Sequence, residues 1–231
     1  MKSGKLVIAI DGPAASGKST TARLTAEHLG YLHIDTGAMY RAMTLKVLRE
    51  GINLEDEEAI GRLAAKTEIR FRRVGGEIHI VMDDEDVSGS VRSRGVTKAV
   101  SAVSSIRKVR EVMVREQRRM GDEGGIVLEG RDIGTVVFPD ADLKIFLVAK
   151  VEERARRRQA DLKNQGIELE LEMVQREISD RDALDSKRVI SPLKKADDAV
   201  VLDTSNLTIP KQVDFIVDKA RELLKAKKEK R

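Results

Sequence analysis

Residues 12–19 read Gly12-Pro13-Ala14-Ala15-Ser16-Gly17-Lys18-Ser19 and match the pattern Gly-x-x-x-x-Gly-Lys-Ser/Thr at every fixed position. The apolar run Leu6–Ile10 precedes this stretch, and a helical pattern over residues 18–29 follows it. Glycines let successive backbone N–H groups turn toward one anion, and the N-terminus of a helix adds partial positive charge. The stretch therefore predicts a loop between a strand and a helix that binds phosphate, which we name the phosphate loop.

Two side chains at the end of the phosphate loop indicate a nucleoside triphosphate as its ligand. Lys18 can reach the β- and γ-phosphates, and the hydroxyl of Ser19 can coordinate Mg²⁺. An ordinary glycine-rich turn is the alternative, but such a turn does not require the Lys-Ser pair. A GTPase would also carry an Asn-Lys-x-Asp tetrapeptide, which the sequence lacks, and a helicase or motor would be larger or repeated.

The composition excludes several other classes of protein. The 231 residues include 43 Lys and Arg against 39 Asp and Glu, and the resulting net charge of +4 argues against bulk nucleic-acid binding. An apolar fraction of 41% excludes a disordered chain, and the lack of cysteine excludes disulfides and cysteine-bound zinc. The longest apolar runs, Leu6–Ile10 and Ile145–Ala149, are far shorter than the roughly 18 residues of a membrane span. Since no signal-peptide pattern precedes the first strand, we expect a cytoplasmic protein.

Apolar runs and helical patterns alternate along the chain, which indicates an α/β fold with a parallel sheet covered by helices on both faces. The expected strands are Leu6–Ile10, Leu32–Ile34, Ile126–Leu128, Leu143–Val148 and Ala199–Leu202. The expected helices cover residues 18–29, 37–50, 104–120, 168–181 and 210–226. One segment breaks the alternation, because Ile69–Phe71 and Ile78–Met82 follow the strand period around Gly75-Gly76. This segment predicts a β-hairpin inside a small antiparallel insert at about residues 66–95.

Four further segments combine arginines with acidic side chains. They are Asp35–Arg41, Glu129–Thr135, Glu152–Arg158 and Arg181–Arg188. In the first, we expect Thr36 to be a helix N-cap and Arg41 to lie in the first helical turn. Each segment also has a plainer interpretation. Asp35–Arg41 could carry an ordinary surface arginine, and Glu129–Thr135 could be a solvated turn. Glu152–Arg158 could be a solvated helix, and Arg181–Arg188 could be an intrahelical ion-pair ladder.

Together these arginines exceed what one triphosphate needs, and a second phosphorylated substrate explains the surplus. A phosphate monoester is largely a dianion at neutral pH, since its second pKa is near 6, so it needs no strong base to act as the acceptor. The site must instead neutralise charge and align two anions that repel each other. An arginine- and lysine-lined site without a catalytic His or Cys fits that demand.

Five blocks of the sequence carry a resemblance to one known family. They are Ile10–Thr20, Asp35–Arg41, Gly130–Pro139, Ser191–Leu193 with Ala196–Ala199, and Asp203–Ser205. In this order they closely resemble the bacterial cytidylate kinases, over nearly the whole chain. The resemblance implies an α/β P-loop kinase fold with a five-stranded parallel sheet flanked by helices. It also implies a core at about 1–65, 96–149 and 182–231, a monophosphate-binding insert at about 66–95 and a lid at about 150–168.

The resemblance further implies a reaction, namely phosphoryl transfer from ATP to CMP or dCMP with Mg²⁺, carried out by a monomer. ATP would be bound by Gly12, Pro13, Ala14, Ala15, Ser16, Gly17, Lys18, Ser19, Thr20 and, from the lid, Arg158, with Ser19 also on the metal. CMP would be bound by Thr36, Tyr40, Arg41, Ser101, Arg110, Arg131, Asp132, Arg181, Asp185 and Arg188. The implied catalytic residues are Lys18, Arg131, Arg158 and Arg188.

Within the CMP set the resemblance implies separate roles. Arg41, Arg131 and Arg188 would hold the phosphate. Arg181 and Asp185 would face the sugar and phosphate, while Ser101, Arg110 and Asp132 would read the cytosine. Glu129 stands where the family often has Asp, which leaves its role open.

Two alternatives compete with this interpretation. One is a P-loop kinase for another small metabolite, such as a different nucleoside monophosphate or a sugar-like acid. The set Ser101, Arg110 and Asp132 argues against it. The other is a nucleic-acid-binding NTPase, against which the small net charge and the 3% aromatic content count, because stacking on single strands uses aromatic side chains.

Overall fold

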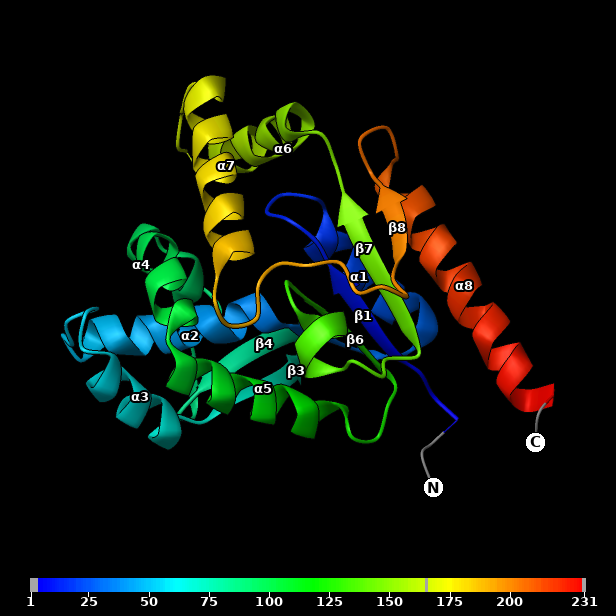
Figure 1. Ribbon diagram of the computed structural model, residues 1–231, viewed down its shortest axis with the longest axis horizontal. Coiled ribbons are helices and arrows are strands. Elements are labelled where there is room, and N and C mark those ends of the chain that lie inside the picture. The colour runs from blue at the N-terminus through cyan, green and yellow to red at the C-terminus, as the bar shows by residue number, and fades with distance from the viewer. Residues whose placement is uncertain (1–3, 165, 230–231) are drawn as a thin grey trace. The chain divides into compact units, whose positions relative to one another are not determined.

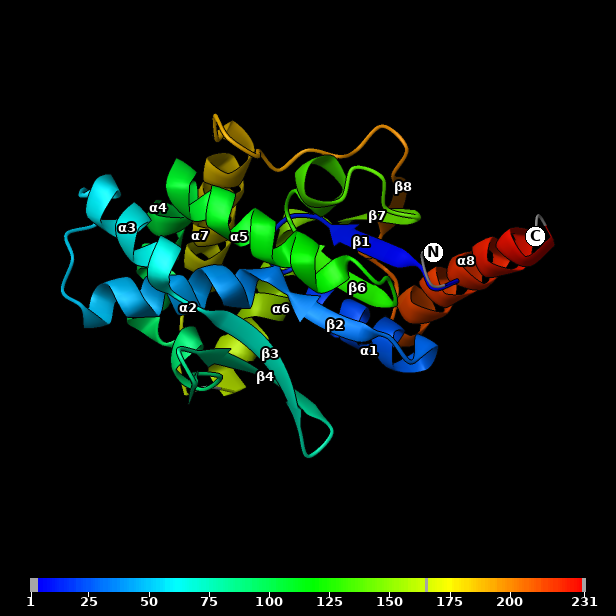
Figure 2. The same ribbon diagram turned by 90° about the horizontal axis from the view of Figure 1, so that it is seen from below.

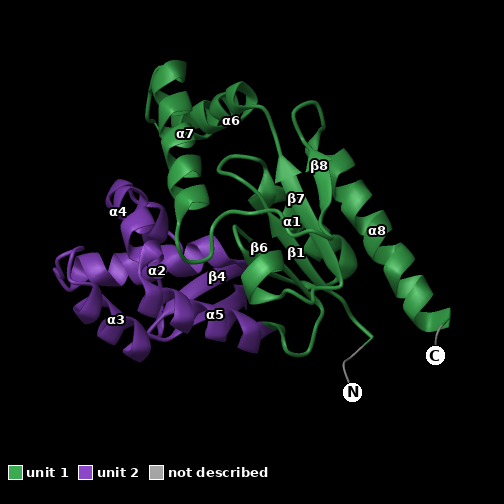
Figure 3. Ribbon diagram, in the orientation of Figure 1, with its two compact units in different colours: residues 1–33, 121–231 green, residues 34–120 purple. Residues whose placement is uncertain are grey.

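The computed structural model describes residues 4–164 and 166–229. Residue 165, which falls in the predicted lid, and residues 1–3 and 230–231, at the ends of the predicted core, lie outside the described residues. The chain forms two compact units, of which the first comprises Met1–His33 with Gly121–Arg231 and the second Ile34–Met120 (Figure 3).

A five-stranded sheet organises the first unit, as the alternating pattern predicts, and only the last two residues of one strand, Ile34 and Asp35, belong to the second unit. Its strands are β1 (Val7–Asp11), β2 (Leu32–Asp35), β6 (Ile126–Gly130), β7 (Leu143–Val148) and β8 (Val200–Asp203), in the order β2-β6-β1-β7-β8. β1 lies between β6 and β7 and pairs in parallel with both, and β7 pairs in parallel with β8 (Figure 1). Because parallel strands end at the same edge, Asp11 at the end of β1 and Glu129 near the end of β6 lie at the same edge of the sheet.

Helices cover this sheet with small and branched side chains. α1 (Lys18–Leu29) and α8 (Ile209–Glu229) pack together, and α1 also contacts β6. Ala22 and Ala26 of α1 and Ala220 of α8 join the fully buried core of β1 and β7. Alanines at these positions let the helices approach closely, and the buried isoleucines of β1 contribute about 2 kcal/mol each by leaving water.

Two further helices of the first unit form a hairpin. α6 (Val151–Asn164) and α7 (Leu171–Lys187) lie side by side around a separate apolar cluster (Figure 1). The predicted helix over residues 168–181 is misplaced at both ends, since α7 begins at Leu171 and continues to Lys187. The chain leaves the helix at Arg188, whose φ of −56° and ψ of 135° are not helical.

The second unit contains the antiparallel insert. β3 (Ile69–Val74), β4 (Glu77–Met82) and the short β5 (Glu85–Asp86) form a three-stranded sheet, of which β3 and β4 are labelled in Figure 2. Val74 pairs with Glu77 across Gly75-Gly76, and both glycines have positive φ, +58° and +91°. A two-residue hairpin loop favours this backbone, because its twist matches that of the strands. The predicted hairpin is confirmed.

Four helices accompany that sheet. They are α2 (Thr36–Arg49), α3 (Glu57–Lys66), α4 (Arg94–Ser105) and α5 (Arg107–Gly121). The predicted single helix over residues 104–120 is wrong, because Ile106 is extended, with φ −67° and ψ 124°, and separates α4 from α5. Among the described residues, no helix is long and apolar enough to cross a membrane.

Candidate active site

The phosphate loop lies between β1 and α1, as predicted, and its backbone is tightly constrained. Gly12 has a φ of +151°, and a Cβ at this position would lie 2.3 Å from the carbonyl oxygen of Leu147. Only glycine lets the loop pass so close to β7. Gly17, with φ +91°, directly precedes α1, so the loop ends at the positive pole of a helix.

Lys18 is buried, and its ammonium group is folded back over the phosphate loop. Its Nζ donates to the carbonyl oxygen of Pro13 at 2.6 Å and to Oγ of Ser16 at 3.4 Å. Burial, together with the positive charges of Arg131 and Arg181, lowers the pKa of Lys18 to about 7, against the opposing effect of the nearby carboxylates of Glu129 and Asp11. An anion arriving on the loop would stabilise this ammonium group, so the site is electrostatically prepared for phosphate.

A chain of hydrogen bonds runs from α1 to β2 through Glu129, at the end of β6. Oγ of Ser19 donates to Oε2 of Glu129 at 2.8 Å, and Nε2 of His33 lies 3.2 Å from Oε1. Burial raises the pKa of Glu129, but the hydrogen bond and charge of His33, with the charge of Lys18, lower it more, so the carboxylate is ionised. His33 was not predicted, because an isolated histidine in a strand carries no motif.

Asp11 closes β1 and holds the turn that follows β6. Its carboxylate accepts the N–H groups of Ile133 and Gly134 at 2.9 and 2.8 Å. Burial raises the pKa of Asp11 to about 6, against the lowering effect of these two hydrogen bonds. The contact fixes the backbone directly after Arg131 and Asp132, so Asp11 positions both side chains. The sequence motifs assign no role to Asp11.

Three of the predicted site residues meet around one buried carboxylate. Nε of Arg131 lies 2.7 Å from Oδ2 of Asp185, and Arg188 pairs with Oδ1 of the same residue. Burial raises the pKa of Asp185, but the charges of Arg131 and Arg188 lower it more, which keeps it ionised. Arg181 adds a further positive charge that lowers the pKa of both Asp185 and Lys18. We name Arg131, Arg181, Asp185 and Arg188 the arginine cluster.

The predicted residues of the second unit form a group of their own. Arg110 is 2% exposed, its guanidinium lies 5.1 Å from the centre of the Tyr40 ring, and its Nη1 donates to the carbonyl oxygen of Ser104 at 3.1 Å. The aromatic face and the carbonyl fix the orientation of this buried cation. Ser101 lies on α4, in the turn before Ser104, and Arg41 donates to Oγ1 of Thr97 at 2.9 Å.

Two expectations about the start of α2 are wrong. The N-cap is Asp35 rather than Thr36, because the Asp35 carboxylate accepts the N–H of Ala38 at 2.9 Å while buried Thr36 is already the first helical residue. Both residue types cap helices well, and the sequence alone does not separate neighbours. Arg41 is the sixth residue of the helix, so it lies in the second turn rather than the first.

The arginine run of α6 divides into different environments. Arg154 is buried and anchored to the backbone, and Arg157 donates to the carbonyl oxygen of Thr204 at 2.6 Å. Arg158 is partly exposed. Arg154 and Arg157 therefore stabilise the fold. The role of Arg158 in binding ATP stays a prediction.

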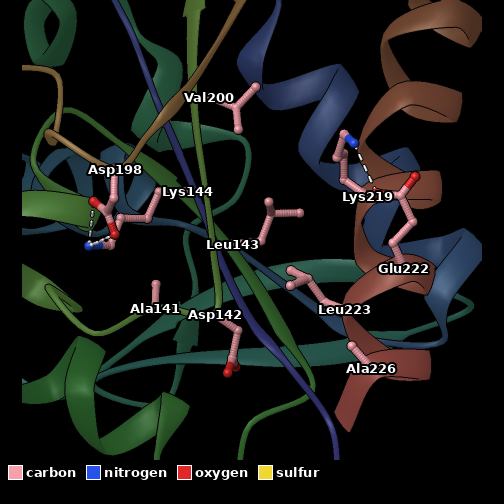
Figure 4. Close-up of a pocket in the computed structure, with 10 residues that line it drawn as sticks. All are labelled: Ala141, Asp142, Leu143, Lys144, Asp198, Val200, Lys219, Glu222, Leu223 and Ala226. Carbon is pink, nitrogen blue, oxygen red and sulfur yellow. Dashed lines mark hydrogen bonds and ion pairs between the residues drawn. The ribbon is translucent and has the colours of Figure 1, made fainter. Parts of the chain in front are cut away.

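A shallow cavity of about 390 Å³ lies elsewhere in the first unit (Figure 4). Leu143 and Val200 line it at the amino-terminal ends of β7 and β8, whereas the phosphate loop follows the carboxyl end of β1. Figure 4 shows Leu143 and Leu223 between β7 and α8, and the ion pair of Lys144 with Asp198, 2.8 Å apart, on the other side of β7. The cavity is separate from the phosphate loop and the arginine cluster.

Comparison with known proteins identifies relatives over nearly the full chain. A family model described as cytidylate kinase matches residues 8–222. A curated protein named cytidylate kinase from Bacillus pumilus is 50% identical over 216 residues, covering 94% of this chain and 96% of the relative. The relative of that name from Streptococcus suis is 51% identical over 218 residues, covering 94% and 97%. That from Pelotomaculum thermopropionicum is 49% identical over 211 residues, covering 91% and 93%.

Proposed function

The chain belongs to the cytidylate kinase family, and we propose that it transfers the γ-phosphoryl group of ATP to CMP or dCMP, giving ADP and CDP or dCDP. The observation that carries this proposal is the near-complete match to relatives of that name at about half identity. A buried lysine on a phosphate loop, in a unit that also holds three clustered arginines, supports it independently.

On the donor side, the phosphate loop would hold the β- and γ-phosphates of ATP through backbone N–H groups. Residues 12–20, the segment that the sequence predicts to bind ATP, would supply these N–H groups. The ammonium of Lys18 would leave its contacts with Pro13 and Ser16 and bind the transferring group, where negative charge must be neutralised. Its depressed pKa means that phosphate binding also draws a proton to Lys18 near neutral pH.

On the acceptor side, we propose that Arg41, Arg131 and Arg188 hold the phosphate of CMP. Arg181 and Asp185 would face the sugar and phosphate. Asp185 keeps Arg131 and Arg188 oriented before any ligand binds, since one carboxylate pairs with both guanidinium groups. Preorganised cations cost little reorganisation when two anions are brought together, and the acceptor dianion needs no base to attack.

For the base, we propose that Ser101, Arg110 and Asp132 recognise cytosine, with Thr36 and Tyr40 completing the CMP site. Arg110 only donates hydrogen bonds and would serve the acceptors of cytosine, while ionised Asp132 only accepts and would take its 4-amino hydrogens. The contacts of Arg110 with Tyr40 and Ser104 support this role, because they hold the buried guanidinium group in a fixed orientation.

The donor atoms near Ser19 fit Mg²⁺. The hydroxyl group of Ser19 donates a hydrogen bond to Glu129, which leaves the oxygen lone pairs of Ser19 available to a hard cation. The described part of the chain contains no group of three or more His, Cys, Asp or Glu side chains that could hold a metal. That suits Mg²⁺, which keeps several waters and shares substrate phosphates rather than filling a protein cage. When bound, the ion would neutralise charge on the β- and γ-phosphates.

Several coarser features of the predicted enzyme are also proposals. The segment at about 150–168 would act as a lid that brings Arg158 over ATP, and the insert at about 66–95 would belong to the monophosphate-binding region. The core would be the remaining segments predicted from the sequence. We further propose that the enzyme works as a monomer in the cytoplasm, where ATP and CMP are available.

A substrate panel tests the proposed function. ADP production by the purified protein is measured with ATP, Mg²⁺ and, in turn, CMP, dCMP, UMP, AMP, shikimate and RNA. We expect kcat/KM to be highest for CMP or dCMP, by at least about tenfold over UMP. If shikimate alone increased ADP production, the protein would be a kinase of another small metabolite. If RNA alone increased ADP production, it would be a nucleic-acid-dependent NTPase. Either result would overturn the proposal.

A further inference from the structure

One ion pair from the α6–α7 hairpin holds both polar groups of Ala14 in the phosphate loop. The N–H of Ala14 donates to Oδ1 of Asp182 at 3.1 Å, and its carbonyl oxygen accepts from Nη1 of Arg154, also at 3.1 Å. Arg154 and Asp182 pair with each other. Nε of buried Arg154 donates in addition to the carbonyl oxygen of Ala149, which anchors the pair to the end of β7.

The next residue of the loop depends on the same hairpin. Ala15 has a φ of +56°, a left-handed conformation that is unfavourable for a residue with a Cβ. Its side chain packs against the apolar cluster of α6 and α7, to which Ala155 and Val174 belong. A strained backbone persists only where its surroundings hold it, so the hairpin determines the shape of this half of the loop.

The helix that holds the loop also holds the arginine cluster. Asp182 and Asp185 are three residues apart on α7, so they occupy the same helix face on adjacent turns. The first binds the loop at Ala14, and the second pairs with Arg131 and Arg188. A displacement of α7 therefore moves a contact of the proposed donor site and a contact of the proposed acceptor site together.

We propose that Arg154 and Asp182 are positioning residues that couple the two substrates, so that ATP on the phosphate loop tightens binding of CMP at the arginine cluster, and the reverse. This inference rests on the proposed function. A ligand on the loop immobilises Ala14, and through Asp182 it immobilises α7 and the carboxylate of Asp185. The protein then loses less conformational freedom when the second ligand binds. Thermodynamic linkage makes the effect reciprocal.

Calorimetry in a binding cycle tests the coupling. The dissociation constant of a non-hydrolysable ATP analogue with Mg²⁺ is measured with and without saturating CMP, and that of CMP with and without the analogue. In the wild type we expect each ligand to tighten the other by at least about fivefold. We call the ratio of the two dissociation constants of one ligand, without and with the other, the coupling factor. In Asp182→Asn, which is nearly isosteric but cannot pair with Arg154 as a carboxylate, the coupling factor should fall to within about twofold of unity while both ligands still bind.

Two variants accompany this measurement. Asp180→Asn makes the same charge change at an exposed position of α7 and should keep the wild-type factor. Arg154→Lys keeps the charge but loses the planar fork that reaches several acceptors, so its factor should be intermediate, and it replaces Asp182→Asn if that variant does not fold. If Arg154 and Asp182 only stabilised the fold, the variants would bind both ligands more weakly and the coupling factor would be unchanged. A factor of one in the wild type, or a wild-type factor in Asp182→Asn, would overturn the inference.

Hydrogen exchange separates a failure of this inference from a failure of the proposed function. The ATP analogue alone should slow amide exchange across residues 171–187 in the wild type but not in Asp182→Asn. If the wild type binds the analogue and not CMP, the proposed acceptor is wrong, and the exchange result still decides whether Asp182 connects the loop to α7. Equal protection of α7 in both proteins would refute that connection.

Discussion

Replacing Lys18 by methionine should lower turnover by more than about tenfold and at the same time stabilise the nucleotide-free protein. The pKa of Lys18 falls from 10.5 to about 7 on folding, so the buried charge costs up to about 5 kcal/mol at 1.36 kcal/mol per pKa unit. Methionine removes this cost but also loses the hydrogen bonds to Pro13 and Ser16, worth about 1 kcal/mol each. A net gain of about 2–3 kcal/mol remains, which corresponds to a rise in Tm of about 4–12 °C for a chain of this size.

The pH dependence gives this prediction a sign. Because the folded pKa of Lys18 lies below the unfolded value, the unfolded chain binds more protons between about pH 7 and 10.5. Wild-type stability therefore rises, relative to that of Lys18→Met, as the pH increases through this window. The advantage of the variant should be largest at or below pH 7 and should shrink by pH 9.5.

Calorimetric unfolding without nucleotide, at pH 7 and pH 9.5, measures both effects. Lys211→Met removes the same charge from an exposed position of α8 and should change Tm by no more than about 1–2 °C. The turnover of Lys18→Met should fall by more than about tenfold, since the lost ammonium stabilises charge that grows in the transition state. A variant less stable than the wild type at pH 7, or a stability gap independent of pH, would refute the reasoning.

Three other substitutions have defined outcomes. Gly12→Ala should lower the free energy of unfolding by about 1–3 kcal/mol and weaken ATP binding, because its Cβ would strike the carbonyl oxygen of Leu147; unchanged ATP affinity in a titration would contradict the loop geometry. Arg158→Ala should reduce kcat more than CMP affinity, and steady-state kinetics showing only a loss of CMP affinity would assign Arg158 to the acceptor. Asp132→Asn should narrow the preference for CMP over UMP in kcat/KM, since its amide can donate to uracil, and an unchanged ratio would remove Asp132 from base recognition.

The features that the sequence predicts well are those encoded locally. Strands buried on both faces, such as β1 and β7, are mainly apolar runs, interrupted in β7 only by Lys144 and ended in β1 by Asp11, so they stand out from the polar helices between them. The phosphate loop needs glycine and lysine at fixed spacing, and the hairpin needs two residues of positive φ, which Gly75-Gly76 provides. These requirements leave a direct trace in the residue types.

The missed features depend on contacts between distant residues. Asp182 and Arg154 read as ordinary charged residues of solvated helices, yet they meet Ala14 from 168 and 140 positions away. His33 reaches Glu129 across 96 positions. The break at Ile106 was missed because no glycine or proline marks it and the helical period continues through it. No local pattern encodes such pairings.

Product analysis tests the central claim most directly. The protein is incubated with ATP, Mg²⁺ and CMP, and the nucleotides are separated and quantified by anion-exchange chromatography. If the γ-phosphoryl group passes directly to the monophosphate, ADP and CDP appear in equal amounts, and Lys18→Met forms neither at a comparable rate. Formation of ADP without CDP, or faster conversion of UMP to UDP than of CMP to CDP, would contradict the account.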